Sequence, residues 1–202
     1  MKRQLLIPAL LLLFLPFAQG KVKLPAMMGD HMVLQQNSSV RLWGRADGKK
    51  VTITTSWNNR TYRTSTDKDG NWLVKVDTPA GGYTPHSITI SDGTPVTLSD
   101  ILIGEVWICS GQSNMEMRMM GNSAQPVDNS LETILNAGNY RDRIRFITVP
   151  RIKDIQKRTD FEGKKWEVSS PETTIDCSAT GYFFAKQLTQ SLNLPVGLVI
   201  NS

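Results

Sequence analysis

Residues 22–103 form short runs in which apolar and polar side chains alternate, and this pattern constrains the fold more than any other feature of the chain. In the runs 51–57 and 72–76, apolar side chains recur at every second position. A period of two is typical of a β-strand with one buried face, and turn residues such as those at 67–70 separate the runs. The sequence therefore predicts an all-β, immunoglobulin-like antiparallel sandwich over residues 21–100, with strands at 40–43, 51–57, 60–66, 72–76, 87–90 and 95–98.

The pattern changes after Asp100. Continuous apolar runs at 106–109, 144–149 and 196–200 indicate buried strands, and the apolar residues of two intervening segments have helical spacing. The expected helices cover 131–137 and 179–192, and Asn193 and Pro195 end the second of them. Strands that alternate with helices favour right-handed crossovers and a parallel sheet, whose binding sites lie beyond the carboxyl ends of the strands. The sequence thus predicts an α/β domain from residue 101 to residue 202.

The stretch Gly111-Gln112-Ser113-Asn114-Met115 connects the strand expected at 106–109 to a segment that suits a helix. A serine in the first helical turn has an unpaired backbone amide, and the helix dipole adds partial positive charge there. Its hydroxyl can act as a nucleophile while its amide stabilises an oxyanion. Gly111 allows a tight turn, but Met115 replaces the second glycine of a G-x-S-x-G elbow. The alternative is that Ser113 only caps the helix.

Five segments carry a resemblance to a known family. They are 28–35 (MGDHMVLQ), 40–44 (VRLWG), 107–116 (WICSGQSNME), 170–173 (SPET) and 181–185 (GYFFA). In this order they resemble the sialate O-acetylesterase family of the SGNH hydrolases. The resemblance implies that residues 101–202 are the N-terminal part of a three-layer α/β/α domain with a parallel sheet, and that the sheet is incomplete. It also implies that Ser113 is the nucleophile, that its backbone amide is an oxyanion donor, that Gly111, Gln112 and Asn114 support them, and that no cofactor is needed.

The resemblance further implies groups that this sequence lacks. In the family, a glycine after the strand matching 196–200 and a later asparagine complete the oxyanion site, and an Asp-x-x-His motif supplies acid and base. The sequence stops at Ser202, before these positions. Because the loss of one oxyanion donor alone costs about 100-fold to 1000-fold in rate, residues 21–202 are expected to have little or no esterase turnover on their own.

The resemblance suggests a carbohydrate O-acetylesterase, but the substrate stays open. O-acetylated sialic acid follows from the family name, and acetylated xylan or another glycan fits equally well. Two other interpretations remain: a non-catalytic secreted glycan-binding or adhesion module in which Ser113 is a cap, or a gene remnant without function. The sequence does not indicate an oligomeric state.

Residues 1–20 have the pattern of a secretory leader, with Lys2 and Arg3, an apolar stretch from 5 to 17, and a small-x-small cleavage site at 18–20. The apolar stretch is shorter than the roughly 20 residues of a membrane-spanning helix. We therefore expect export to the periplasm or the extracellular space, and no membrane span in the mature chain. The formal charge is +5. The basic doublets lack an aromatic-basic surface around them, which argues against nucleic-acid binding.

Few other side chains suggest chemistry. Cys109 and Cys177 could form a disulfide in an exported protein, or could pack as buried thiols. His31 is expected in a docking segment and His86 on the surface, and no metal-binding spacing occurs. Aromatic faces can stack on sugar rings, but three tryptophans are expected to lie in strands and to face the core, namely Trp43, Trp57 and Trp72.

Overall fold

The computed structural model describes residues 22–152 and 155–202. The predicted leader, at residues 1–20, lies outside the described residues. None of the helices in the described ranges is long and apolar enough to cross a membrane. The elements, in chain order, are β1 (Val33–Gln35), β2 (Ser39–Arg45), β3 (Lys50–Thr55), β4 (Thr61–Ser65), β5 (Asn71–Asp77), β6 (Gly82–Ser91), β7 (Pro95–Ser110), α1 (Ser113–Glu116), α2 (Ser130–Leu135), η1 (Ala137–Tyr140), β8 (Ile144–Thr148), β9 (Glu167–Val168), α3 (Pro171–Thr174), α4 (Ala179–Leu192) and β10 (Val196–Asn201).

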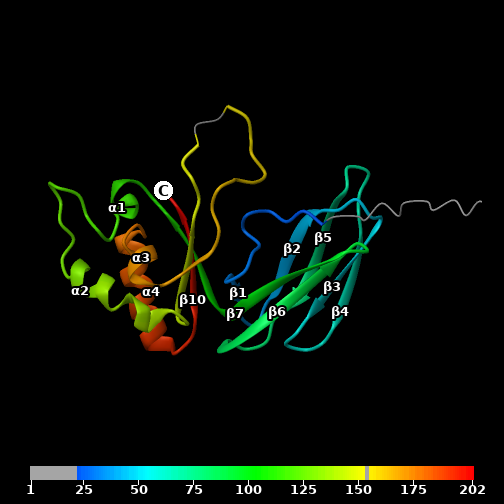
Figure 1. Ribbon diagram of the computed structural model, residues 1–202, viewed down its shortest axis with the longest axis horizontal. Coiled ribbons are helices and arrows are strands. Elements are labelled where there is room, and N and C mark those ends of the chain that lie inside the picture. Colours follow the sequence, from blue (N-terminus) through cyan, green and yellow to red (C-terminus); the bar gives the residue numbers. More distant parts are fainter. Residues whose placement is uncertain (1–21, 153–154) are drawn as a thin grey trace, which may run out of the picture.

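The fold is mixed α/β with one large sheet and few helices (Figure 1). The strand order of this sheet is β4-β3-β6-β7-β10-β8-β9, and β1 pairs with β7 outside that path. A second sheet contains only β2 and β5, which are antiparallel. Apolar side chains of both sheets share one core, which includes Leu42, Val76, Ile53 and Ile90. The predicted strands of this half are confirmed in position, whereas its immunoglobulin-like topology stays a prediction.

Strand β7 is a single strand of 16 residues where the sequence predicts two separate ones, at 95–98 and 106–109. Its first part pairs with β6 in antiparallel fashion, and its last part pairs with β10 in parallel. The polar residues Ser99 and Asp100 suggest a break between two strands, but they lie in the interior of β7. The main chain of Ser99 binds Asp30 and His31, so the strand changes partners without ending.

The strands β7, β10 and β8 are mutually parallel, as the sequence predicts. Helix α4 covers one face of them, and the core on that side includes Tyr182, Ala185, Phe146 and Leu198. Asn193 ends α4 in the left-handed conformation, with φ 54°, which agrees with the expected end of this helix. The ends of β7 and β10 therefore lie at one edge of the sheet, where parallel sheets place their binding sites.

Three short elements have no counterpart in the predicted pattern. Strand β1 has only three residues and pairs with β7 almost 70 positions later, a contact that local periodicity does not reveal. Strand β9 and helix α3 lie within 151–175, where the sequence pattern predicts no element. Helix α3 begins with a capping box in which the Ser170 hydroxyl accepts from the amide of Thr173, so its signal was present in the sequence.

A charged cluster joins the N-terminal segment to two strands of the large sheet. The Nδ1 atom of His31 lies 2.7 Å from Oδ2 of Asp100, and the buried guanidinium of Arg145 donates to Oδ1 of Asp100 at 2.9 Å. Partial burial raises the pKa of the Asp100 carboxyl, but hydrogen bonds from His31 and Arg145 outweigh it and leave the pKa below its ordinary value. His31 thus lies at a docking contact, as expected.

Replacing Asp100 by asparagine is expected to lower the free energy of unfolding by about 2 kcal/mol at pH 7, a value reduced because Asp100 is partly exposed. Asparagine tolerates the left-handed φ of 54° at this position, so the change tests the charge. Because the folded pKa lies below the ordinary 3.8, the stabilisation is present above that pH and is lost as the pH falls through the folded pKa.

Urea unfolding midpoints at pH 7 and pH 3 check this prediction. Asp77→Asn is the matched control, because the Asp77–Arg60 ion pair is more than half exposed and is worth little. An equal loss of stability at both pH values in the Asp100 variant would show that charge is not the cause.

Candidate functional site

Ser113 lies just beyond the carboxyl end of β7, as the sequence predicts. Ser110 is the last residue of β7 and pairs with Asn201 of β10. Helix α1 begins at Ser113, and the carbonyl of Gln112 accepts hydrogen bonds from the amides of Met115 and Glu116. Gly111 does not have a positive φ. A Cβ atom at Gly111 would lie 3.0 Å from Cβ of Met115, so this glycine provides space for the turn.

Helix α1 is held against the start of α4. The Thr180 hydroxyl donates to the main-chain oxygen of Asn114 at 2.9 Å, and the Ser178 hydroxyl donates to the sulfur of Met115 at 3.3 Å. After the helix, the amide of Ala179 donates to the oxygen of Met117 at 2.7 Å. These contacts position the turn that carries Ser113. The contact at Asn114 is made by its main chain, and its supporting role at the site stays a prediction.

The hydroxyl and the amide of Ser113 are both available. None of the residues that the structure describes forms a hydrogen bond with either group, and the side chain is exposed. Because α1 has only four residues, its dipole is small, and the sequence argument from a helix dipole is weaker than expected. What remains is a free backbone donor directly next to a free hydroxyl, which is the pairing that acyl transfer uses.

An open hollow of about 530 Å³ lies beside Ser113, and we call it the Ser113 hollow. It is lined by Ser113, Glu116, Met117, Arg118, Met120, Gly121, Asn122 and Gln125. Residues of the loop 119–129 thus contribute to it. Two main-chain hydrogen bonds between Asn122 and Gln125, each 3.1 Å long, close the loop at its tip.

Glu116 and Arg151 form an ion pair at the rim of the Ser113 hollow. Arg151 also donates through Nε to the main-chain oxygen of Ser202, at 3.0 Å. Sequence reasoning missed this pair, because its members are 35 positions apart and Arg151 lies in a stretch without periodicity. The one available signal was that both residues follow strands whose carboxyl ends meet at the same edge.

Neither histidine forms a hydrogen bond with Ser113. His31 contacts Asp100, and the ring of His86 stacks edge-to-face on Trp57 with 5.7 Å between centroids. His86 is half-buried and burial lowers its pKa, so it lies only partly on the surface, where the sequence places it. Within the described ranges, no cluster of acidic, histidine and cysteine side chains could hold a metal ion.

The two cysteines are buried free thiols. Burial raises the pKa of Cys109 and raises that of Cys177 well above its ordinary value. Both thiols belong to the core between α4 and the sheet. They act as apolar packing groups, which is one of the two alternatives that the sequence leaves open.

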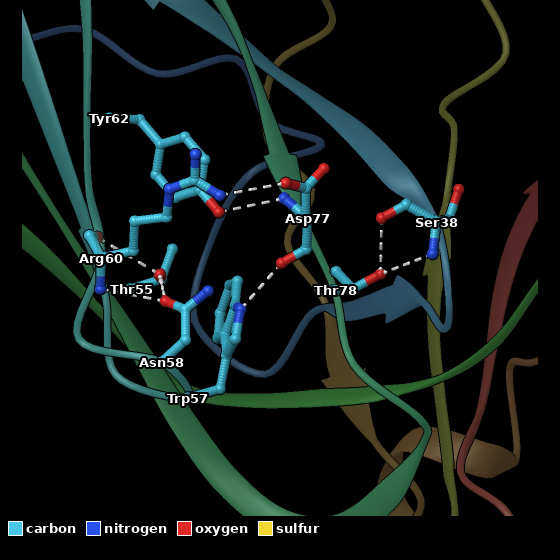
Figure 2. Close-up of polar contacts among 8 residues, drawn as sticks. All are labelled: Ser38, Thr55, Trp57, Asn58, Arg60, Tyr62, Asp77 and Thr78. Atoms are coloured by element: carbon cyan, nitrogen blue, oxygen red, sulfur yellow. Dashed lines mark hydrogen bonds and ion pairs between the residues drawn. The ribbon is translucent and has the colours of Figure 1, made fainter.

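The three tryptophans differ in position. Trp72 is 3% exposed and belongs to the core, which confirms its predicted burial. Trp57 lies in the turn after β3, not in a strand, and its Nε1 donates to the main-chain oxygen of Asp77 at 2.9 Å (Figure 2). The prediction for Trp43 is wrong, because this side chain is 38% exposed on the outer face of β2. Val40 and Leu42 turn inward there, so Trp43 must face outward.

No family model matches the chain. Individual relatives do. Sialate O-acetylesterase of Rattus norvegicus is 28% identical over 190 residues, which cover 86% of this chain and 34% of the relative, and that of Homo sapiens is 27% identical over 194 residues, which cover 87% and 36%. A solved carbohydrate acetylesterase from Xanthomonas citri has a TM-score of 0.78 and 26% identity, covering 89% of this chain and 40% of that one. The chain thus spans about a third of the length of its curated relatives, and these comparisons support its assignment to the sialate O-acetylesterase family.

Proposed function

We propose that this protein acts in removing O-acetyl groups from glycans, with Ser113 as the nucleophile. The observation that carries the proposal is the exposed Ser113, whose hydroxyl and amide are both available at the carboxyl end of a parallel strand. Similarity to the sialate O-acetylesterases supports it. The proposal also assigns 101–202 to an SGNH-type α/β/α domain and 21–100 to an immunoglobulin-like sandwich.

In the proposed reaction, Oγ of Ser113 attacks the acetyl carbonyl carbon, and its proton passes to a base. The tetrahedral oxyanion is stabilised by the backbone amide of Ser113 and by further donors. The bond to the sugar oxygen then breaks, the sugar leaves as an alcohol after taking a proton, and the acetyl group stays on Ser113. Water attacks this ester, which releases acetate and restores the serine.

The proposal assigns the base and the further oxyanion donors to residues outside the part of the chain that the structure describes. His31 and His86 are engaged elsewhere, and Glu116 is paired with Arg151. In the family that the chain resembles, a glycine, an asparagine and an Asp-x-x-His motif supply these groups, at positions after the strand matching β10. On this proposal, residues 21–202 alone have little esterase turnover, since none of the residues that the structure describes is a hydrogen-bond partner of the Ser113 hydroxyl that could accept its proton.

Covalent labelling of the full-length protein with a fluorophosphonate probe tests the proposal. We expect one probe per molecule, and peptide mapping by mass spectrometry should place it on Ser113. Ser110→Ala should still be labelled, because Ser110 is the last residue of β7 and lies outside the Ser113 hollow. A folded protein that resists labelling would favour a glycan-binding module in which Ser113 is only a helix cap.

A further inference from the structure

Trp43 presents an aromatic surface to solvent from a position that the core does not require. Alternation along β2 places Leu42 inward, at 1% exposure, and Trp43 outward, at 38%. Its cross-strand neighbour on β5 is Leu73, which is 53% exposed. An exposed tryptophan beside an exposed leucine forms an apolar patch on an otherwise polar strand face, and such patches mark binding sites.

Two adjoining hollows, of about 690 and 800 Å³, meet at this patch. They share Pro25, Trp43, Thr159 and Asp160, and we call the combined surface the Trp43 groove. One end of the groove reaches Asn201, at the carboxyl end of β10. The other end follows β2 and β5 as far as Asn71. The groove is therefore lined by residues of both halves of the molecule.

The walls of the groove are held by contacts distant in sequence. Oδ1 of Asp160 accepts from the amide of Ala26 at 3.0 Å, across 134 positions. Trp166 donates through Nε1 to the main-chain oxygen of Met27 at 2.9 Å. A carboxylate can accept about four hydrogen bonds, so Asp160 keeps acceptor capacity for a ligand. The groove therefore combines the exposed aromatic surface of Trp43 with an exposed carboxylate that the amide of Ala26 holds.

The Trp43 groove and the Ser113 hollow are connected through one ion pair. Arg151 lines the groove, and its partner Glu116 lines the Ser113 hollow three residues after Ser113 itself. Both hollows open at the edge where β7, β8 and β10 end. A ligand that has one group at Ser113 can therefore extend past Arg151 toward Trp43.

We propose that the Trp43 groove binds neutral pyranose residues of a glycan chain whose acetylated residue is held at Ser113, an inference that rests on the proposed function for its link to catalysis. The flat C–H face of a pyranose ring matches an indole face, and its hydroxyls donate to a carboxylate such as Asp160. The groove is lined by acidic side chains, among them Asp67 and Glu162, and by basic ones, so neither sign of charge dominates and an anionic sugar is not favoured. The groove would thus select a polymer over a single acetylated sugar.

Binding of unacetylated hexasaccharides to the full-length protein tests this site independently of catalysis. The probes are linear β-xylan, β-glucan, β-mannan and β-galactan hexasaccharides, and intrinsic tryptophan fluorescence and calorimetry measure their Kd. We expect at least one to bind with a Kd below about 1 mM, and Trp43→Ala to weaken it by about tenfold. Trp43→Phe should retain most of the affinity, because it keeps a flat aromatic face. No binding by any probe, or equal binding by Trp43→Ala, would overturn the proposal.

The matched control is Trp107→Ala, which removes an exposed tryptophan that lines neither the groove nor the Ser113 hollow. Hydrolysis assays then separate the two proposals. Trp43→Ala should raise KM for an acetylated hexasaccharide about tenfold and leave hydrolysis of 4-nitrophenyl acetate unchanged. Ser113→Ala should abolish both hydrolyses and leave hexasaccharide binding intact. If Ser113→Ala stays active, the proposed function fails. The binding result then still decides whether the Trp43 groove binds a glycan chain.

Discussion

The Ser113→Ala variant of the full-length protein is expected to release acetate from an O-acetylated oligosaccharide about 10⁴-fold to 10⁶-fold more slowly than the unchanged protein. The reason is that alanine has no oxygen to form the acetyl-enzyme, so the reaction must use water directly. The backbone amide at position 113 remains, and it stabilises the oxyanion as before. A small residual rate above that of water is therefore expected, measured as acetate formed over time.

Ser110→Ala is the control for this experiment, because Ser110 is exposed at the end of the same strand. Its rate should stay within about twofold of the unchanged protein. A Ser113→Ala variant that keeps more than a tenth of the activity would assign the nucleophile to another residue. Circular dichroism spectra of both variants show whether a loss of rate has a structural cause.

The Gly104→Ala variant is expected to lose about 3 kcal/mol or more in free energy of unfolding. A Cβ atom at Gly104 would lie 2.1 Å from the main-chain oxygen of Pro195. That oxygen accepts from the amide of Glu105 at 2.9 Å, where β7 begins to pair with β10. Because the clash is with backbone, no side-chain rotation relieves it, and the two strands must separate locally.

Gly82→Ala provides the matched control for Gly104. Gly82 is also in a strand, it pairs with Ile103, and nothing lies within 4 Å of the position where its Cβ would be. Its free energy of unfolding should change by less than about 1 kcal/mol. Urea unfolding followed by tryptophan fluorescence measures both variants, and equal midpoints would mean that β7 and β10 can move apart without cost.

Local patterns predicted most of the elements, because their causes are local. The alternation in β5 and the helical spacing in α4 each arise from one buried face, which can be seen within a single segment. The continuity of β7 could not be predicted in this way. It depends on β1 and β10, which come from distant parts of the chain, and on the segment before β1, whose Asp30 and His31 bond to Ser99 and Asp100.

The candidate site was predictable at Ser113 and less so around it. The motif and its place after a strand predicted the serine, because strand, turn and helix are adjacent in sequence. The Glu116–Arg151 pair depends on how 151–175 folds back, which the sequence pattern does not encode locally. Trp43 was misassigned although the information was present, since Val40 and Leu42 already defined the inward phase of β2.

The length of β7 also restricts how the molecule can move. At about 3.3 Å per residue, its 16 residues span at most about 50 Å, with Pro95 at one end, Ser110 at the other and the left-handed Asp100 between them. If the half that contains β6 rotated relative to the half that contains β10, the hydrogen bonds of β7 to β6 or to β10 would have to break. On the proposed function, access to Ser113 would then depend on loops such as the one at 119–129, which lines the Ser113 hollow, and Trp43 would bind a polymer at a set distance from Ser113.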